Sequence, residues 1–200
     1  MPFGDSITDY GCWRALVWEM FQQSGHDVEF VGSRTSETAC GGLVYDRDHE
    51  GHPGYAAAGI ASQNQLVDWL RQNPADIITM HLGTNDILQR RGPTSAILEA
   101  FSTMVGQMRD SNPSMMIIVA QIIPLPQYAA AVDELNASIP AWAASVNSTR
   151  SPVYVVDQWT GLDPSTDLYD GVHLTESGEL KVADRFYSAL VQAIHSIGKE

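Results

Sequence analysis

Short apolar runs alternate with longer segments of helical periodicity, and this alternation constrains the fold more than any other sequence feature. The runs are almost continuously apolar or β-branched, as is typical of strands buried on both faces, and they occupy residues 30–32, 76–82, 115–123 and 153–156. The segments between them space their apolar residues by about 3.6 positions, which predicts helices from Trp13 to Gly25 and over 60–73, 96–109, 129–146 and 176–197.

This alternation predicts an α/β fold: a three-layer α/β/α sandwich around a central parallel sheet of about five strands, joined by right-handed crossovers. A short first strand would end at Gly4. No internal repeat and no Pro/Ser-rich linker divides the 200 residues, so we expect a single domain over residues 1–200. The functional loops of this architecture lie at the carboxyl ends of the strands.

The charge balance excludes two classes of partner. The chain has 11 basic and 24 acidic residues and a formal charge of -13, which repels phosphate backbones and anionic lipid surfaces. No apolar run approaches the roughly 20 residues of a membrane-spanning helix. We therefore expect no nucleic acid partner and no membrane partner, and we expect a monomer.

Three residues on two of the predicted loops have the chemistry needed for nucleophilic catalysis. Ser6 would follow the first strand, and Asp170 and His173 share one loop. A serine hydroxyl is a weak nucleophile near neutral pH and needs a base, which in turn needs a carboxylate to fix its tautomer. The alternative is structural, because Ser6 could cap a helix, Asp170 could form a turn and His173 could be an ordinary surface histidine.

Asn85 and Gly54 are candidates for stabilising a developing oxyanion. Asn85 follows the strongest predicted strand, where its side-chain amide could donate a hydrogen bond, and Gly54 could offer its backbone N–H. Both residues are equally suited to simple turns that tolerate positive φ.

These motifs together resemble a known family. Gly4-Asp5-Ser6, Gly54, Gly83-Thr84-Asn85-Asp86 and Asp170-Gly171-Val172-His173 occur in the order and approximate spacing of the four blocks of the GDSL, or SGNH, hydrolases. Within that superfamily, with its flavodoxin-like fold, Met1-Pro2-Phe3-Gly4-Asp5-Ser6-Ile7-Thr8, Phe30-Val31-Gly32-Ser33 and His49-Glu50-Gly51-His52-Pro53-Gly54-Tyr55 are most similar to carbohydrate esterase family three. The resemblance covers nearly the whole chain.

The resemblance implies a serine esterase that removes acetyl groups from xylan or xylo-oligosaccharides through an acyl-enzyme, with no cofactor and no metal. Ser6 would be the nucleophile, His173 the general base and Asp170 its orienting carboxylate. The amides of Ser6 and Gly54 and the side chain of Asn85 would form the oxyanion hole. The alternatives are a lipase, thioesterase or lysophospholipase on the same fold, or a catalytically silent carbohydrate-binding relative.

Further candidates concern the substrate and a metal. Asp5, Tyr55 and Trp159 are expected to contact substrate, Trp159 because it follows the last predicted strand and precedes Asp170. The acidic loop 46–52 holds side chains that could bind a metal, namely Asp46, Asp48, His49, Glu50 and His52. The preferred interpretation is that these residues serve substrate hydroxyls or their own turns.

The two cysteines and two glycosylation sequons favour a secreted protein. Adjacent first and second strands would bring Cys12 and Cys40 onto one side of the sheet, so we predict a disulfide, with two free thiols as the alternative. The sequons begin at Asn136 and Asn147. Residues 1–4 lack the pattern of a signal peptide, so we expect any such peptide to be removed or absent.

Overall fold

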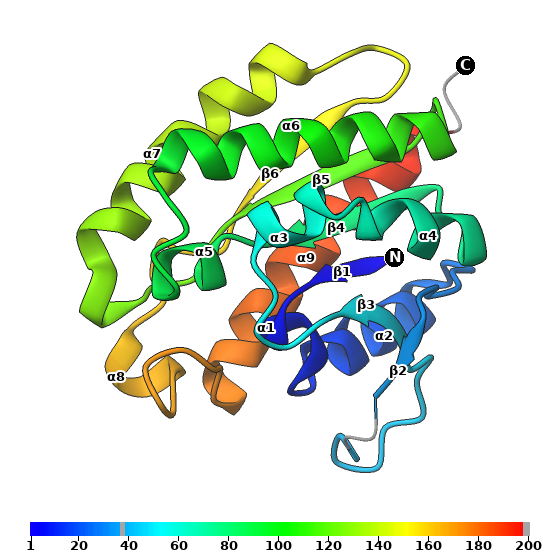
Figure 1. The fold of residues 1–200 in the computed structure, drawn as a ribbon. Helices are drawn as coiled ribbons and strands as arrows, with labels where there is room; N and C mark the ends of the chain where they lie inside the picture. The colour runs from blue at the N-terminus through cyan, green and yellow to red at the C-terminus, as the bar shows by residue number, and fades with distance from the viewer. Residues whose placement is uncertain (37–38, 198–200) are drawn as a thin grey trace.

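A six-stranded sheet lies between two layers of helices in the computed structural model, which describes residues 1–36 and 39–197 (Figure 1). The strand order is β2-β3-β1-β4-β5-β6, and every neighbouring pair is parallel except β2 and β3. The strands are β1 (Pro2–Gly4), β2 (Arg34–Thr35), β3 (Asp48–Gly51), β4 (Ile77–His81), β5 (Met116–Gln121) and β6 (Val153–Asp157). The predicted three-layer α/β architecture is confirmed.

The helices divide between the two faces of the sheet. One face is covered by α3 (Ala57–Ser62), α4 (Gln65–Gln72), α6 (Thr94–Ser111) and α7 (Ala129–Val146), and the other by α2 (Trp13–Ser24) and α9 (Glu176–Ile197). Short helices α1 (Ser6–Asp9), α5 (Thr84–Leu88) and α8 (Pro164–Asp167) and the 3-10 turn η1 (Pro126–Tyr128) lie in the connections.

Alternate residues of β5 contribute to the two cores. Ile117 and Val119 belong to the core under α6 and α7, whereas Met116 and Ile118 belong to the core under α2 and α9. Side chains of a strand alternate between faces, so an apolar strand between two helical layers must be apolar throughout. This requirement explains why the run predicted at 115–123 was so clear.

One predicted strand is wrong. Residues 30–32 form no strand, because the Phe30 amide donates to the Asp46 carboxylate at 2.8 Å and the Ser33 amide donates to Glu50 at 2.7 Å. Side chains thus replace the strand ladder there. The strand beside β1 is β3, whose residues are polar and largely buried.

The predicted helices agree with the structure except in one region. The bounds of α7 and α9 match, and α2 ends before Gly25, whose φ of 72° is the left-handed conformation that glycine adopts without strain. The segment 60–73 is two helices, α3 and α4, separated at Asn64, which has φ 52°.

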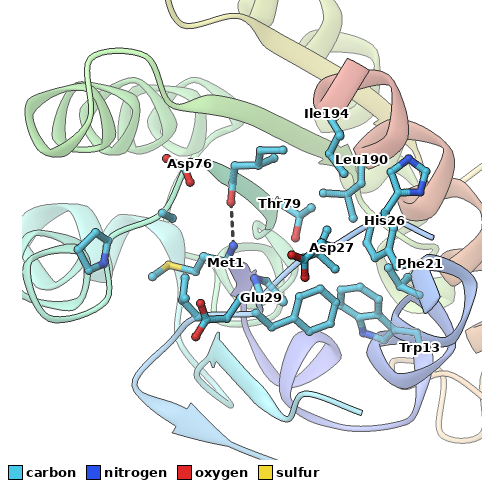
Figure 2. A pocket seen from close by; sticks show the side chains of 18 residues that line it. Met1, Trp13, Phe21, His26, Asp27, Glu29, Asp76, Thr79, Leu190 and Ile194 are labelled. Carbon is cyan, nitrogen blue, oxygen red and sulfur yellow. Dashed lines mark hydrogen bonds between the residues drawn. The ribbon is translucent and has the colours of Figure 1, made fainter. Parts of the chain in front are cut away.

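A hollow of about 380 Å³, lined by both apolar and charged side chains, opens at the amino ends of β1 and β4 (Figure 2). Phe21, Trp13 and Leu190 line it, and the amino group of Met1 donates to the Ile77 carbonyl at 2.7 Å beside it. The opposite, carboxyl ends of these strands carry the residues described next. Among the described residues, no helix is long and apolar enough to cross a bilayer.

Candidate active site

Ser6 lies at the point of the sheet where the strand order reverses. It is the first residue of α1, two positions after β1 ends. The chain passes from β1 to β3 on one side and then to β4 on the other, so the carboxyl end of β1 is a topological switch point. This is the position where α/β folds form their binding crevices.

The structure brings Ser6, His173 and Asp170 into a hydrogen-bonded row. His173 Nε2 is 2.9 Å from Ser6 Oγ across 167 positions of sequence, and His173 Nδ1 is 2.7 Å from Asp170 Oδ2. The hydroxyl thus has a base within reach, and the second ring nitrogen of that base faces a carboxylate. This arrangement can move a proton from a serine hydroxyl to an imidazole and can stabilise the resulting cation.

Asp170 is kept as a carboxylate by its own loop. Oδ1 accepts hydrogen bonds from the amides of Val172 and His173 at 2.9 and 2.7 Å. Partial burial acts to raise the pKa of Asp170, but the hydrogen bonds from His173 and Val172 outweigh it and lower the pKa below its ordinary value. The loop is closed by a bridge between Leu168 and Leu174, which holds His173 towards Ser6.

Asp5 is fully buried beneath this row and has no surface to offer a substrate. Its Oδ1 caps α1 by accepting from the Ile7 amide at 3.0 Å, and its Oδ2 accepts from Asn85 Nδ2 at 3.1 Å. Burial raises the pKa of Asp5 to about 7, against the lowering effect of these two hydrogen bonds. Asp5 therefore positions Ser6 and Asn85, in contrast to the expected substrate contact.

Asn85 retains donor capacity towards the site. A side-chain amide carries two N–H groups, and the Nδ2 of Asn85 uses one of them on Asp5. Asn85 lies in α5 directly after β4, at the same sheet edge as Ser6.

The loop that carries Gly54 is held from both sides. Gly54 adopts φ +79°, a conformation that favours glycine, and its carbonyl accepts from Gln89 Nε2 at 2.7 Å. Asp86 accepts from the amides of Ala57 and Ala58 at 2.7 and 2.9 Å, which ties α5 to the start of α3. Burial raises the pKa of Asp86 although these two amides oppose the shift.

A ring stack supports the same loop. His52 stacks on Trp69 with ring centroids 4.1 Å apart, and Tyr55 stacks on His52 at 5.0 Å and lies 6.4 Å from Trp69. The buried Glu50 carboxylate lies 2.5 Å from His52 Nε2. Tyr55, one of the expected substrate contacts, remains 40% exposed beside Gly54.

The side chains of the acidic loop 46–52 are directed to separate local partners. Asp46 accepts from the amides of Phe30 and Asp48, and Glu50 binds Ser33 and His52. His49 Nε2 lies 3.2 Å from Asp9 Oδ1 without hydrogen-bond geometry, and burial lowers the pKa of His49 to about 3. The described residues include no group of three or more metal-ligating side chains.

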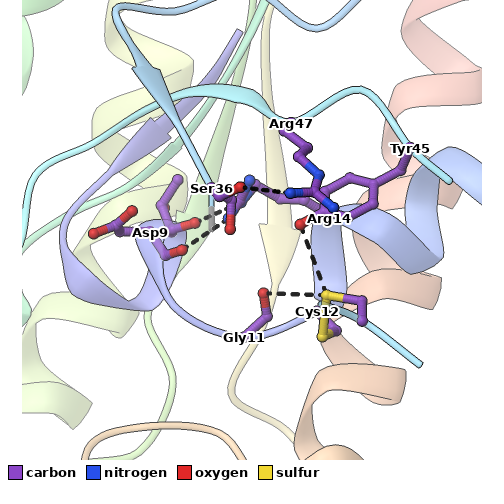
Figure 3. The surroundings of a disulfide bond; sticks show 9 residues. Asp9, Gly11, Cys12, Arg14, Ser36, Tyr45 and Arg47 are labelled. Atoms are coloured by element: carbon purple, nitrogen blue, oxygen red, sulfur yellow. Dashed lines mark hydrogen bonds between the residues drawn. A yellow bond between two sulfur atoms is a disulfide. The ribbon is translucent and has the colours of Figure 1, made fainter. Parts of the chain in front are cut away.

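The end of α1 is fixed by a buried arginine and by the disulfide between Cys12 and Cys40, which confirms the predicted pairing (Figure 3). Arg14 is fully buried and donates from Nε to the Thr8 carbonyl at 2.6 Å and from Nη2 to the Asp9 carbonyl at 2.8 Å. Its guanidinium thus donates hydrogen bonds to carbonyls at the end of the helix that have no intrahelical donors. No sequence motif indicated this role.

Two further aromatic residues at the site were not predicted. Tyr10 and Tyr169 flank the His173 imidazole with ring centroids 5.3 and 5.8 Å away, and both are exposed. Trp159, which was predicted to contact substrate, is 38% exposed in the loop after β6, and its ring takes part in none of the aromatic contacts among the described residues. The only sequence signal for the two tyrosines was their position close to Ser6 and Asp170 along the chain.

The two sequons differ in accessibility. Asn136 is buried in α7, where its Oδ1 accepts from the Ile122 amide and its Nδ2 donates to the Ile122 carbonyl, both within 2.9 Å. A glycan cannot be attached to a side chain enclosed in this way, so the prediction for Asn136 is wrong. Asn147 is exposed after α7 and stays a prediction.

Comparisons with known proteins agree with the observed fold. The family model of the GDSL-like Lipase/Acylhydrolase family matches residues 3–180. A carbohydrate esterase family 3 structure from Talaromyces cellulolyticus is 34% identical with a TM-score of 0.92, covering 98% of this chain and 97% of that chain. A mutant acetyl esterase crystallised with acetate ion is 33% identical with a TM-score of 0.92, covering 99% and 98%.

Two relatives from other sources extend the comparison. A Clostridium thermocellum family 3 carbohydrate esterase is 30% identical with a TM-score of 0.85, covering 98% of this chain and 96% of that chain. A multidomain esterase from Ruminococcus flavefaciens is 27% identical over 209 residues, which span 91% of this chain but only 27% of that protein. With the family model matching most of its length, this chain belongs to the GDSL-like Lipase/Acylhydrolase family and is a carboxylic ester hydrolase close in structure to the family 3 carbohydrate esterases.

Proposed function

We propose that this protein is a serine esterase that removes acetyl groups from acetylated carbohydrate such as xylan or xylo-oligosaccharides. The observation that carries the proposal is the row from Ser6 through His173 to Asp170 at the switch point of the sheet. Its support for carbohydrate is the full-length similarity to acetyl esterases and family 3 carbohydrate esterases at 30–34% identity.

The proposed reaction has two halves. Ser6 Oγ attacks the acetyl carbonyl carbon while His173 Nε2 takes the hydroxyl proton, and the tetrahedral oxyanion accepts hydrogen bonds from the amides of Ser6 and Gly54 and from Asn85 Nδ2. The intermediate collapses, the C–O bond to the sugar breaks, and His173 returns the proton to the departing sugar oxygen. Asp170 stabilises the imidazolium throughout.

The acetylated Ser6 is then hydrolysed. A water molecule gives a proton to His173 and attacks the acetyl carbonyl, and collapse of the second tetrahedral intermediate releases acetate and restores the serine hydroxyl. We further propose that the protein acts outside the cell, since the disulfide between Cys12 and Cys40 is favoured in oxidising compartments.

Substrate competition tests this proposal against the lipase-like alternative. We expect specificity constants to fall steeply from acetyl to butyryl to octanoyl esters of p-nitrophenol, and acetate to be released from acetylated xylan. A steady rise with acyl length would favour a lipase, because each methylene that fits an apolar pocket adds binding energy. Labelling by a serine-directed phosphonate should disappear in Ser6→Ala, and labelling that persists there would contradict the role of Ser6.

A further inference from the structure

Two exposed tyrosines enclose the imidazole of His173 from different elements. Tyr10 follows α1 and is tilted by 50° against the imidazole, whereas Tyr169 precedes Asp170 and lies nearly parallel to the ring at 21°. Tyr10 is 46% exposed and Tyr169 is 65% exposed, although large aromatic side chains tend to be buried. Their faces are thus available to a molecule bound beside His173.

The chemistry of the proposed reaction assigns this side of the site to the alcohol half of the ester. His173 Nε2 must give its proton to the departing oxygen, so that oxygen has to come within hydrogen-bond distance of the imidazole. Groups that surround the imidazole therefore contact the leaving alcohol. The acetyl oxygen, in contrast, is turned towards Gly54 and Asn85.

A hollow of about 50 Å³ lies between these tyrosines and His173, and Glu179 of α9 also lines it. A Cβ added to Gly11 would clash with Glu179 Oε1, so the carboxyl group packs directly against Gly11 at this hollow. Burial raises the pKa of Glu179, the Cys12 amide opposes the shift and Glu176 adds to it. The volume suits one small polar substituent, such as a hydroxyl or hydroxymethyl group.

We propose that Tyr10, Tyr169 and Glu179 form the subsite for the sugar that leaves, with a pyranose face against the tyrosine rings and one sugar hydroxyl donating to Glu179. This inference rests on the proposed function, because only a polyhydroxylated alcohol uses both the aromatic faces and the carboxyl acceptor. Aromatic rings supply large contact area at little conformational cost, and the carboxyl adds directional recognition.

The test compares two acetyl esters that differ in their alcohol. We expect Tyr10→Ala, Tyr169→Ala and Glu179→Gln each to lower kcat/KM for acetylated xylobiose by about tenfold, mainly through KM. For ethyl acetate, whose alcohol is too small to reach the tyrosines, we expect a loss at least about fivefold smaller. Matched controls on α9 are Leu180→Ala, an exposed apolar neighbour of Glu179, and Asp184→Asn, an exposed carboxyl of the same helix.

Equal losses for both esters would overturn the subsite, since they would indicate a general effect on His173. A larger sugar-specific loss in Trp159→Ala than in Tyr169→Ala would also overturn it and would place the sugar after β6. Failure of the proposed function gives a different result: the parent protein would cleave ethyl acetate but release no acetate from acetylated xylobiose.

Binding without turnover gives an independent readout. Titration of Ser6→Ala with unacetylated xylobiose should show binding by calorimetry, and adding Tyr169→Ala to that variant should weaken it by about tenfold. Unchanged affinity in the double variant would contradict the role of Tyr169, whatever the kinetic result.

Discussion

Asn85 Nδ2 donates a hydrogen bond to Asp5 Oδ2 at 3.1 Å, between two residues that are 80 positions apart and both buried. The contact joins the segment that follows β1 to the segment that follows β4, the neighbouring strands whose carboxyl ends form the site. It also fixes the rotation of the Asn85 amide about the bond to its β-carbon. The second N–H of that amide is then directed without further ordering, which is what an oxyanion donor requires.

Asp5→Asn should change how stability depends on pH. The folded state raises the pKa of Asp5 from 3.8 to about 7, mainly by burial, so folded protein keeps a proton that the unfolded chain releases above pH 3.8. The parent therefore loses stability as pH rises from about 4 to 7, and the loss is constant above that. The asparagine side chain of the variant does not titrate. The free energy of unfolding of the variant, relative to that of the parent, should therefore rise by on the order of 4 kcal/mol across this interval.

The measurement for Asp5→Asn is urea unfolding of both proteins at steps between pH 4 and 8. The lost contact with Asn85 shifts the free energy of unfolding by an amount that does not depend on pH. The prediction is therefore tested by how the difference in free energy of unfolding between variant and parent changes with pH. Glu99→Gln, which removes one exposed carboxylate of α6, is the control for charge alone. A constant difference between Asp5→Asn and parent would contradict burial as the cause.

Asn85→Ala and Ser6→Ala should differ in severity. Removal of one oxyanion donor typically lowers kcat on the order of 100 to 1,000-fold. Removal of the nucleophile should cost on the order of 10,000-fold or more, and should leave the unfolding midpoint almost unchanged because it leaves no core cavity. Initial rates with p-nitrophenyl acetate test both, and an Asn85→Ala variant as active as the parent would remove Asn85 from the oxyanion hole.

Long apolar patterns predicted the fold well, and polar strands escaped prediction. The periodicity of 129–146 and 176–197 coincides with the bounds of α7 and α9. In contrast, β3 consists of Asp48, His49, Glu50 and Gly51, a run that reads as a loop because nothing in it is apolar. Its polar side chains are buried because Ser33, His52 and Asp9 lie against them, and those contacts exist only after folding.

The candidate site divides in the same way. Ser6 follows the end of β1, and Asp170 and His173 share the loop between α8 and α9. Their motifs occur in a recognisable order, so their proximity was predictable from the sequence. The roles of Asp5 and Arg14 depend on which buried atoms meet, and a residue type alone does not report that. Asp5 was consequently expected to contact substrate, and Arg14 was not singled out.

Removing the disulfide should destabilise the protein and loosen the turn that carries Tyr10. The bond closes a loop with a sequence separation of 28, and loss of such a constraint costs about 3 to 4 kcal/mol through the entropy of the unfolded chain. Unfolding of Cys12→Ala/Cys40→Ala, compared with the parent under non-reducing conditions, measures this cost. Two free thiols in the denatured, unreduced parent would contradict the pairing itself.

Arg14→Met should destabilise the fold and disturb the short helix α1 that carries Ser6. The guanidinium satisfies the carbonyls of Thr8 and Asp9, and methionine keeps the apolar volume but leaves these buried acceptors without a donor. We expect the free energy of unfolding to fall by on the order of 3 kcal/mol, since hydrogen bonds to charged groups contribute about 1.5 to 3 kcal/mol each and part of that gain offsets the cost of burying the charge.

We also expect kcat for p-nitrophenyl acetate to fall in Arg14→Met, because Ser6 lies in the same short helix as Thr8 and Asp9. Arg14→Lys, with a charge but without the planar fork, should be intermediate in stability. Chemical unfolding followed by tryptophan fluorescence gives the stabilities, and an Arg14→Met variant within about 0.5 kcal/mol of the parent would show that the carbonyls find other donors.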